Sequence, residues 1–280
     1  EEGYSTDLLA AEAVRLIESR DPKRPLFLYL PFNAPHAPLQ APQALIDKYS
    51  AIADKPRRIH AAMVEAMDAG VGRVLAALEK AGIADNTIVL FFSDNGGPTA
   101  HARNTPLRAG KNTTFEGGMR VPAILRWPGR LKPGVSAQVM TVEDVFPTLA
   151  AAAGVKTRSQ LPFDGRNLWS AIQRGRADGR EDLFFATESQ YTIYLAIFRK
   201  EWKLVCEITR QDGHTREHLF RIQQDPEEKE NVAERYPEVV RDLAARIERW
   251  RAVHPFNGVR FSNEPPAGWK APELWAEAAR

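Results

Sequence analysis

Residues 87–92 form a continuous run of β-branched and aromatic side chains, and this run restricts the fold most strongly. A strand without polar alternation is buried on both faces, which is typical of a sheet covered by helices on both sides. Similar apolar runs occupy residues 26–30 and 121–127. Apolar residues recur at helical spacing over residues 58–80, between the apolar runs at 26–30 and 87–92. The order strand, helix, strand predicts a parallel α/β sheet.

The sequence changes character after residue 164. Short apolar segments joined by turn-like residues indicate an antiparallel meander, and they lie at residues 195–198, 202–206 and 219–222. Further helices are expected at residues 5–18, 143–153 and 237–250. The tail, residues 255–280, is rich in Pro, Gly and Trp and is expected to wrap the surface. We therefore predict an α/β domain over residues 1–180 and a smaller subdomain over residues 181–280.

Composition excludes several classes of partner. The 38 basic and 36 acidic residues are spread along the chain and leave a net charge of +2, so no extended basic surface for nucleic acid is present. No apolar run approaches the ~20 residues that span a bilayer, so no membrane span is expected. The single cysteine, Cys206, cannot form an intramolecular disulfide and is expected to be a buried apolar side chain.

Polar residues follow the run at 87–92 directly, in the order Ser93-Asp94-Asn95-Gly96-Gly97. In open α/β sheets, ligands bind beyond the carboxyl ends of the strands. A carboxylate beside an amide oxygen offers hard ligands for Ca²⁺ or Mg²⁺, and the glycines let the backbone turn closely around an ion. The same residue types also dominate simple turns, so this motif alone leaves both interpretations open.

Two further side chains in loops are candidates for the same site. Lys111 lies in a polar, glycine-punctuated loop, residues 104–120, and could neutralise charge on an anionic ester. His36 lies in a proline-bounded loop, residues 33–38, and could donate a proton or a hydrogen bond to a leaving oxygen. Taken singly, such residues are more often a solvated lysine and a structural histidine.

The conjunction of His36, Asp94-Asn95 and Lys111, in this order, resembles the sulfatase family of the alkaline phosphatase superfamily. Three blocks carry the resemblance: Leu28 to Pro38, Phe92 to Gly97, and Asn104 to Gly118. It continues through residues 63–68, 201–204 and 219–231. The resemblance implies an alkaline-phosphatase-like sandwich with a mainly parallel sheet between helices. It also implies a smaller carboxy-terminal α+β subdomain with an antiparallel sheet.

The resemblance further implies an activity and a site. The protein would be a calcium-dependent sulfuric ester hydrolase acting on a small aryl or carbohydrate sulfate, with Ca²⁺ preferred to Mg²⁺. Asp94 and Asn95 would be metal ligands, Lys111 would contact the sulfate, and His36 would contact the sulfate or assist the leaving group. The family's nucleophile is a formylglycine, whose hydrated aldehyde attacks sulfur before the sulfated enzyme eliminates sulfate. A periplasmic or secreted location is also implied.

The sequence departs from the family pattern in two ways. Ala109 and Asn112 stand where the family often has glycine, which concerns the geometry of the Lys111 loop. The 280 residues also lack the Cys- or Ser-x-Pro-x-Arg motif that yields formylglycine, a consecutive Asp-Asp pair and a Gly-Lys-Trp-His block. We therefore expect the chain to be a fragment without the amino-terminal strands, with little activity of its own.

Three other functions fit parts of the sequence. A phosphate or phosphonate monoester hydrolase of the same superfamily would use a similar site, and a non-catalytic domain could retain the scaffold. The residues His214-Thr215-Arg216-Glu217-His218 also match the His-x-x-Glu-His pattern of zinc peptidases, which requires a helix. Because the pattern runs into a predicted strand at 219–222, we expect it not to form a peptidase site.

Overall fold

The computed structural model describes residues 2–157, 161–180, 182–253 and 268. Its elements are α1 (Ser5–Glu18), α2 (Gln43–Lys48), α3 (Lys55–Lys80), η1 (Ala84–Asn86), β1 (Val89–Phe92), α4 (Glu116–Met119), β2 (Ala123–Arg126), α5 (Val142–Ala152), α6 (Trp169–Arg174), β3 (Leu183–Glu188), β4 (Thr192–Arg199), β5 (Trp202–Thr209), β6 (Thr215–Arg221), η2 (Ala233–Arg235) and α7 (Pro237–Val253). No helix in these described ranges is both long and apolar enough to cross a membrane.

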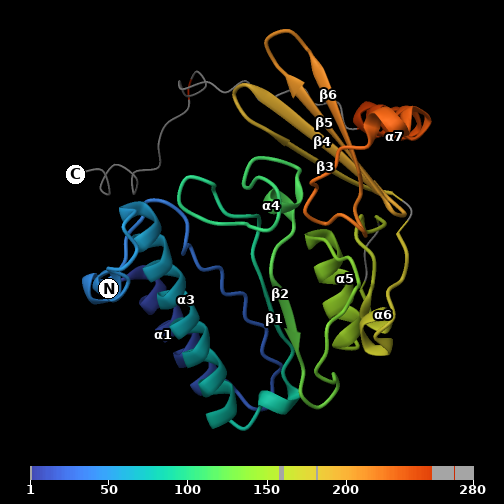
Figure 1. The fold of residues 1–280 in the computed structure, drawn as a ribbon. Coiled ribbons are helices and arrows are strands. Elements are labelled where there is room, and N and C mark those ends of the chain that lie inside the picture. The colour runs from blue at the N-terminus through green and yellow to red at the C-terminus, as the bar shows by residue number, and fades with distance from the viewer. Residues whose placement is uncertain (1, 158–160, 181, 254–267, 269–280) are drawn as a thin grey trace.

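Strands β1 and β2 lie between two groups of helices, α1 with α3 on one side and α5 with α6 on the other (Figure 1). Helix α3 begins after Asp54, whose side chain accepts a hydrogen bond from the Arg57 amide at 2.8 Å. Ile17 of α1 is buried in the same apolar cluster as Ala77 and Leu78 of α3. The predicted α/β class, with a sheet between helices, is confirmed.

The direction of β2 differs from the sequence-based expectation. Strand β1 pairs antiparallel with β2, with Leu90 opposite Leu125, so the parallel direction predicted for these two strands is wrong. The reason lies in the connection: the Gly96 amide donates to the Gly118 carbonyl at 2.8 Å, which keeps residues 93–122 at the end of the sheet where β1 stops. The chain therefore enters β2 from the same end, whereas a parallel pair needs a crossover.

The apolar run at residues 26–30 forms no strand, so its prediction as a buried strand is wrong. Phe27 is 86% and Tyr29 is 76% exposed. Leu28 packs partly against the cluster that contains Ile17, and Leu30 is half-buried, so the run is covered on one side only. The run lacks a neighbouring strand in the described part of the chain, and hydrogen-bonded pairing is what defines a strand.

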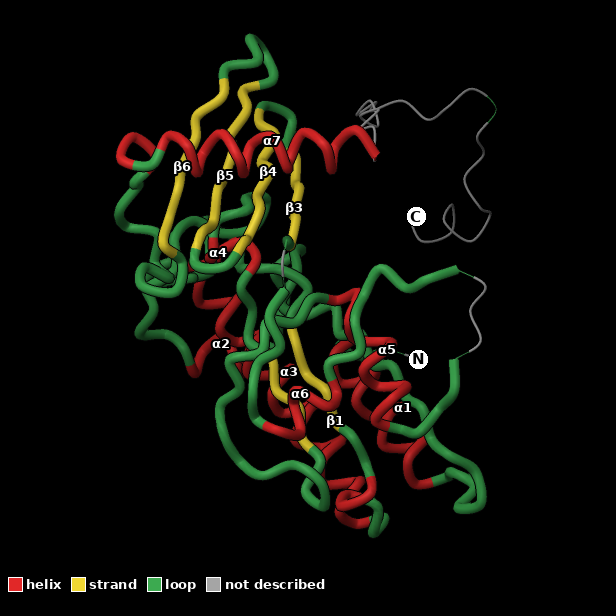
Figure 2. The backbone as a smooth tube through the Cα atoms, turned by 90° about the vertical axis from the view of Figure 1, so that its right-hand side faces the viewer, coloured by secondary structure: helices red, strands yellow, loops and turns green. Residues whose placement is uncertain are grey.

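Strands β4, β5 and β6 confirm the predicted antiparallel meander, and β3, which was not predicted, adds a fourth strand in the order β3-β4-β5-β6. Helix α7 crosses one face of this sheet (Figure 2). Leu204 and Cys206 of β5 belong to the cluster that includes Leu243 of α7. Val205, between them, packs with Phe115 in a separate cluster. Alternate residues of β5 thus face opposite sides, so the sheet joins α7 to the segment that begins α4.

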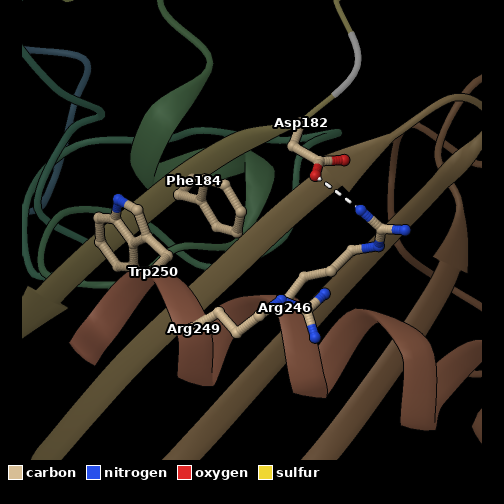
Figure 3. A pocket seen from close by; sticks show the side chains of 5 residues that line it. All are labelled: Asp182, Phe184, Arg246, Arg249 and Trp250. Atoms are coloured by element: carbon tan, nitrogen blue, oxygen red, sulfur yellow. Dashed lines mark hydrogen bonds and ion pairs between the residues drawn. The ribbon is translucent and has the colours of Figure 1, made fainter. Parts of the chain in front are cut away.

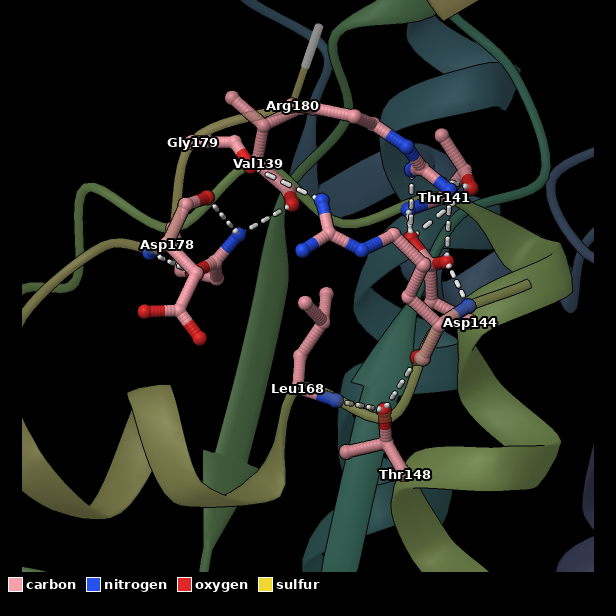
Figure 4. A network of polar contacts seen from close by, with 10 residues as sticks. Val139, Thr141, Asp144, Thr148, Leu168, Asp178, Gly179 and Arg180 are labelled. Atoms are coloured by element: carbon pink, nitrogen blue, oxygen red, sulfur yellow. Dashed lines mark hydrogen bonds and ion pairs between the residues drawn. The ribbon is translucent and has the colours of Figure 1, made fainter.

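Asp144 ties the start of α5 to the segments around α6 (Figure 4). Its buried carboxylate accepts hydrogen bonds from the amides of Thr141 at 2.9 Å and Arg166 at 2.7 Å. Both terminal nitrogens of Arg180 donate to the two carboxylate oxygens, at 2.8 and 2.9 Å. Burial disfavours the charged form, but these donors prevail and lower the pKa of Asp144 below its usual value.

The boundary between residues 180 and 181 stays a prediction. The predicted surface-wrapping tail at 255–280 lies, apart from Gly268, outside the described residues.

Candidate functional site

Asp94 and Asn95 lie immediately beyond the carboxyl end of β1, where the sequence places them. Asp94 is exposed and Asn95 is half-buried. Within the described ranges, neither side chain makes a hydrogen bond or an ion pair. Consecutive residues beyond the end of β1 therefore carry a carboxylate and an amide oxygen that have no described hydrogen-bond or ion-pair partner.

The loop that contains Lys111 is joined to this pair through Gly97. The Lys111 amide donates to the Gly97 carbonyl at 3.2 Å. Asn104 ties the same two segments together: Gly97 donates to the Asn104 Oδ1 at 2.9 Å, and the Asn104 Nδ2 donates to the carbonyls of Gly97 and Ala109, at 2.8 and 3.0 Å. Residues 94–97 and 104–111, which the sequence only suggested to be neighbours, are thus one hydrogen-bonded unit.

This unit depends on close backbone approaches. A Cβ atom on Gly96 would overlap the Gly117 carbonyl, and one on Gly117 would overlap the Arg108 carbonyl. Ala109 and Asn112 adopt φ values of 59° and 70°, in the left-handed region that glycine prefers. These two positions depart from the family pattern in sequence, but each keeps the backbone conformation that glycine prefers. The departure therefore leaves the backbone of the Lys111 loop glycine-like at both positions.

The ammonium group of Lys111 makes no ion pair with any described residue, and the side chain is half-buried. Its backbone is bonded to Gly97, so the loop that carries Lys111 is joined to the turn that carries Asp94 and Asn95. An ammonium group without a described ion pair is suited to binding an anion.

His36 lies in an exposed loop, and the structure describes no contact that joins it to Asp94 or Lys111. Its amide donates to the Asn33 carbonyl at 2.8 Å. The ring Nδ1 lies 2.7 Å from the Ala37 carbonyl, and because a carbonyl only accepts, Nδ1 carries the hydrogen. The tautomer is therefore set by the loop itself, and Nε2 is the nitrogen left for an outside partner.

Three buried charged residues support the site, and sequence reasoning missed them. Lys203 of β5, fully buried, lies 2.9 Å from Glu116 and 2.7 Å from Glu228. The Glu116 amide also donates to the Glu228 carboxylate at 2.7 Å. The one available signal was a lysine inside the apolar run 202–206, where a charge is costly unless it is paired.

The other candidate chemical groups in the sequence form no additional site. His214 precedes β6 and His218 lies within it, so the His-x-x-Glu-His pattern is on a strand, as expected. The described residues contain no group of three or more His, Cys, Asp or Glu side chains that could hold a metal. Cys206 is buried, as predicted, and burial raises its pKa to about 12.

A cavity of about 260 Å³ lies between β3 and α7, lined by Asp182, Phe184, Arg246, Arg249 and Trp250 (Figure 3). The rings of Phe184 and Trp250 stack with centroids 5.2 Å apart, and Asp182 pairs with Arg246 at 3.0 Å. Because α7 and Phe115 pack on opposite faces of the sheet, this cavity is separate from the site beside Asp94.

The chain is similar to known proteins over most of its length. The sulfatase family profile matches residues 1–155, and the profile of the N-sulphoglucosamine sulphohydrolase carboxy-terminal region matches residues 110–253. The chain is 30% identical to arylsulfatase J of Mus musculus, over 88% of this chain and 48% of that protein. It is 33% identical to N-acetylgalactosamine-6-sulfatase of Homo sapiens, over 72% of this chain and 40% of that protein.

The chain is also similar in fold to a solved structure. The chain superposes on Ps i-CgsB in complex with k-i-k-neocarrahexaose with a TM-score of 0.81 and 33% identity, over 100% of this chain and 60% of that one. The sequence therefore spans about half the length, or less, of these curated relatives, and a larger part of this structural neighbour.

Proposed function

This chain belongs to the sulfatase family, and from this membership we propose that the site beside Asp94 hydrolyses sulfate esters of carbohydrates or aryl alcohols. The proposal is carried by the hydrogen bond from the Lys111 amide to the Gly97 carbonyl. This bond joins the loop that carries the Lys111 ammonium to the turn that carries the side-chain oxygens of Asp94 and Asn95. The names of the relatives indicate the substrate class: an arylsulfatase, an N-acetylgalactosamine-6-sulfatase and a neocarrahexaose complex.

We propose that Asp94 and Asn95 hold a divalent cation, Ca²⁺ in preference to Mg²⁺. The oxygen atoms of these two consecutive side chains have no described partner, and such oxygens suit a hard cation. When bound, the cation would supply positive charge to the sulfate oxygens. Two oxygens are fewer than the six to eight that Ca²⁺ takes, so the proposal requires further ligands, and it places them outside the described residues.

Lys111 has a separate part in the proposal. Its ammonium would lie against the non-bridging sulfate oxygens, where negative charge is held during transfer of the sulfuryl group. Because the backbone of Lys111 is already fixed on Gly97, little reorganisation would be needed at the moment of reaction.

His36 would act on the oxygen that leaves. With Nδ1 donating to the Ala37 carbonyl, only Nε2 can reach a substrate, and it donates a proton only when the ring is in its cationic form. We propose that the nucleophile is a formylglycine contributed by residues outside this sequence, since none of the 280 residues lies in the motif that yields it.

The test uses the protein expressed from the complete open reading frame that encodes this chain. Release of sulfate from an aryl sulfate and from N-acetylgalactosamine 6-sulfate is compared with release of phosphate from the matching phosphate esters. We expect faster turnover of the sulfates, loss of activity with a chelator, and better recovery with Ca²⁺ than with Mg²⁺. Preferential turnover of the phosphate esters would contradict the proposed reaction, and full activity after chelation would contradict the metal site.

A further inference from the structure

Lys203, Glu116 and Glu228 form a buried charged triad where the four-stranded sheet meets the site. The three side chains come from β5, from the first residue of α4 and from the loop after β6, and their exposed fractions are 0%, 5% and 1%. Besides its two carboxylate partners, the Lys203 ammonium lies 4.7 Å from the centroid of the Phe198 ring. Burial raises the pKa of Glu228, although the Lys203 ammonium opposes this shift.

The triad is connected to both loops of the candidate site through α4. Directly after Glu116, the Gly117 amide donates to the Arg108 carbonyl at 2.8 Å, and the Gly118 carbonyl accepts from the Gly96 amide at 2.8 Å. The first bond holds the Lys111 loop, and the second holds the turn that presents Asp94. One short helix therefore fixes both halves of the site.

A second link runs from Glu228 to the Lys111 loop. The Arg108 guanidinium donates to the Glu228 carbonyl at 3.1 Å and lies 4.4 Å from the Phe115 ring centroid. Phe115 precedes Glu116 and packs on Val205 and Phe220 of the sheet. The triad, Arg108 and this apolar contact together attach the site loops to β5 and β6, and the triad contributes the buried ion pairs of this attachment.

We propose that Lys203 is a positioning residue for the candidate site: through its ion pairs with Glu116 and Glu228 it fixes α4, and α4 in turn fixes Lys111 relative to Asp94 and Asn95. Lys203 touches no substrate in this scheme. Its kinetic consequence rests on the proposed sulfatase function, whereas its effect on the two loops does not.

Two variants separate positioning from simple loss of stability. Lys203→Met removes the ammonium, so buried Glu228 loses its described ion-pair partner and buried Glu116 keeps only Arg120, at 3.5 Å, which is strongly destabilising. The triple variant Lys203→Met, Glu116→Gln, Glu228→Gln removes all three charges at similar side-chain volume, and such neutral replacements of buried ion pairs often keep the fold. The matched control is Arg180→Met, which breaks the ion pair with buried Asp144 but has no link to α4.

The experiment measures amide hydrogen exchange and sulfate-ester kinetics on the protein from the complete open reading frame, below the melting temperature of every variant. In both triad variants we expect faster exchange at the amides of Gly96, Lys111 and Gly117, with α1 and α3 unchanged. We expect kcat to fall by about 10- to 100-fold, the order that small misplacements of reacting groups cost, with KM changing much less. Arg180→Met should leave the three amides and kcat unchanged.

The outcomes are distinguishable. If the unaltered protein releases no sulfate but the three amides exchange faster in the triad variants, the proposed function fails and the positioning role stands. If Lys203→Met does not fold, the triple variant decides. Unchanged exchange at Gly96, Lys111 and Gly117 in the triple variant overturns the inference, as does an unchanged kcat in a protein that is otherwise an active sulfatase.

Discussion

Replacing Asp144 by Asn is expected to lower the stability of the protein strongly. The carboxylate is fully buried and accepts five hydrogen bonds, two at Oδ1 and three at Oδ2. An amide keeps one acceptor oxygen and turns a donor toward the donors at the other position. Arg180 also loses its charged partner, and its side chain is only 18% exposed.

The magnitude follows from this geometry. Breaking a buried ion pair costs about 3–5 kcal/mol, and the partial exposure of Arg180 favours the lower end, about 3 kcal/mol, because solvent screens part of its charge. At about 2–4 °C per kcal/mol for chains of this size, the melting temperature should fall by roughly 6–12 °C. The control is Asp178→Asn, because Asp178 pairs with Arg174 at 3.3 Å on the surface and should change stability by about 0–1 kcal/mol.

The effect should depend on pH with a definite sign. The native pKa of Asp144 is lowered, so its stabilisation is fully present above the unfolded pKa, about 3.9, and is lost as pH falls through the native pKa. The free energy of unfolding is measured by urea titration followed by tryptophan fluorescence. The difference in this free energy between the unaltered protein and Asp144→Asn should be complete at pH 7 and should shrink below pH ~4. A loss no larger than that of Asp178→Asn, or a difference independent of pH, would refute the reasoning.

Three further predictions concern the core and the site. Cys206, buried with its pKa raised to about 12, should react with a thiol reagent only after denaturation, and rapid labelling of the native protein would contradict its burial. Gly96→Ala should abolish sulfate release because its Cβ would overlap the Gly117 carbonyl, whereas Gly72→Ala, with no atom within 4 Å of its Cβ, should be harmless. Asp94→Ala should weaken Ca²⁺ binding, measured by calorimetry, without lowering the melting temperature of the metal-free protein. An unchanged affinity for Ca²⁺ would show that Asp94 is not a ligand.

Local patterns predicted most of the fold, because each depends on neighbouring residues only. The helix at 58–80 was readable from its periodicity and the strand at 87–92 from its continuous apolar run, and they exist as α3 and β1. The predicted burial of this strand on both faces is wrong, because β1 is only partly buried and Phe92 is 37% exposed. The direction of β2 was not readable, because it depends on where the 30 residues between the strands travel. The run at 26–30 failed for a related reason, since a strand requires a partner that its own sequence does not specify.

The candidate site was partly predictable. Asp94 and Asn95 follow a recognisable strand, and Lys111 follows a recognisable glycine pattern, so sequence motifs located both. Their joining through Gly97 and Asn104 is a product of folding. The Lys203 triad was not predicted, because its one local signal was a lysine inside the apolar run 202–206 and its partner Glu116 lies 87 positions away in the chain.

The most direct test of the proposed site is the kcat/KM of Lys111→Ala for a sulfate ester, measured beside Lys132→Ala in the protein from the complete open reading frame. Lys132 is exposed and lies in the loop after β2, so its replacement should leave turnover unchanged. Removing one positioned donor from developing negative charge typically costs ~10²–10³ in rate, and Lys111→Ala should lose this much with little change in melting temperature. Near-normal turnover of Lys111→Ala, or a loss explained by unfolding, would contradict the proposed site.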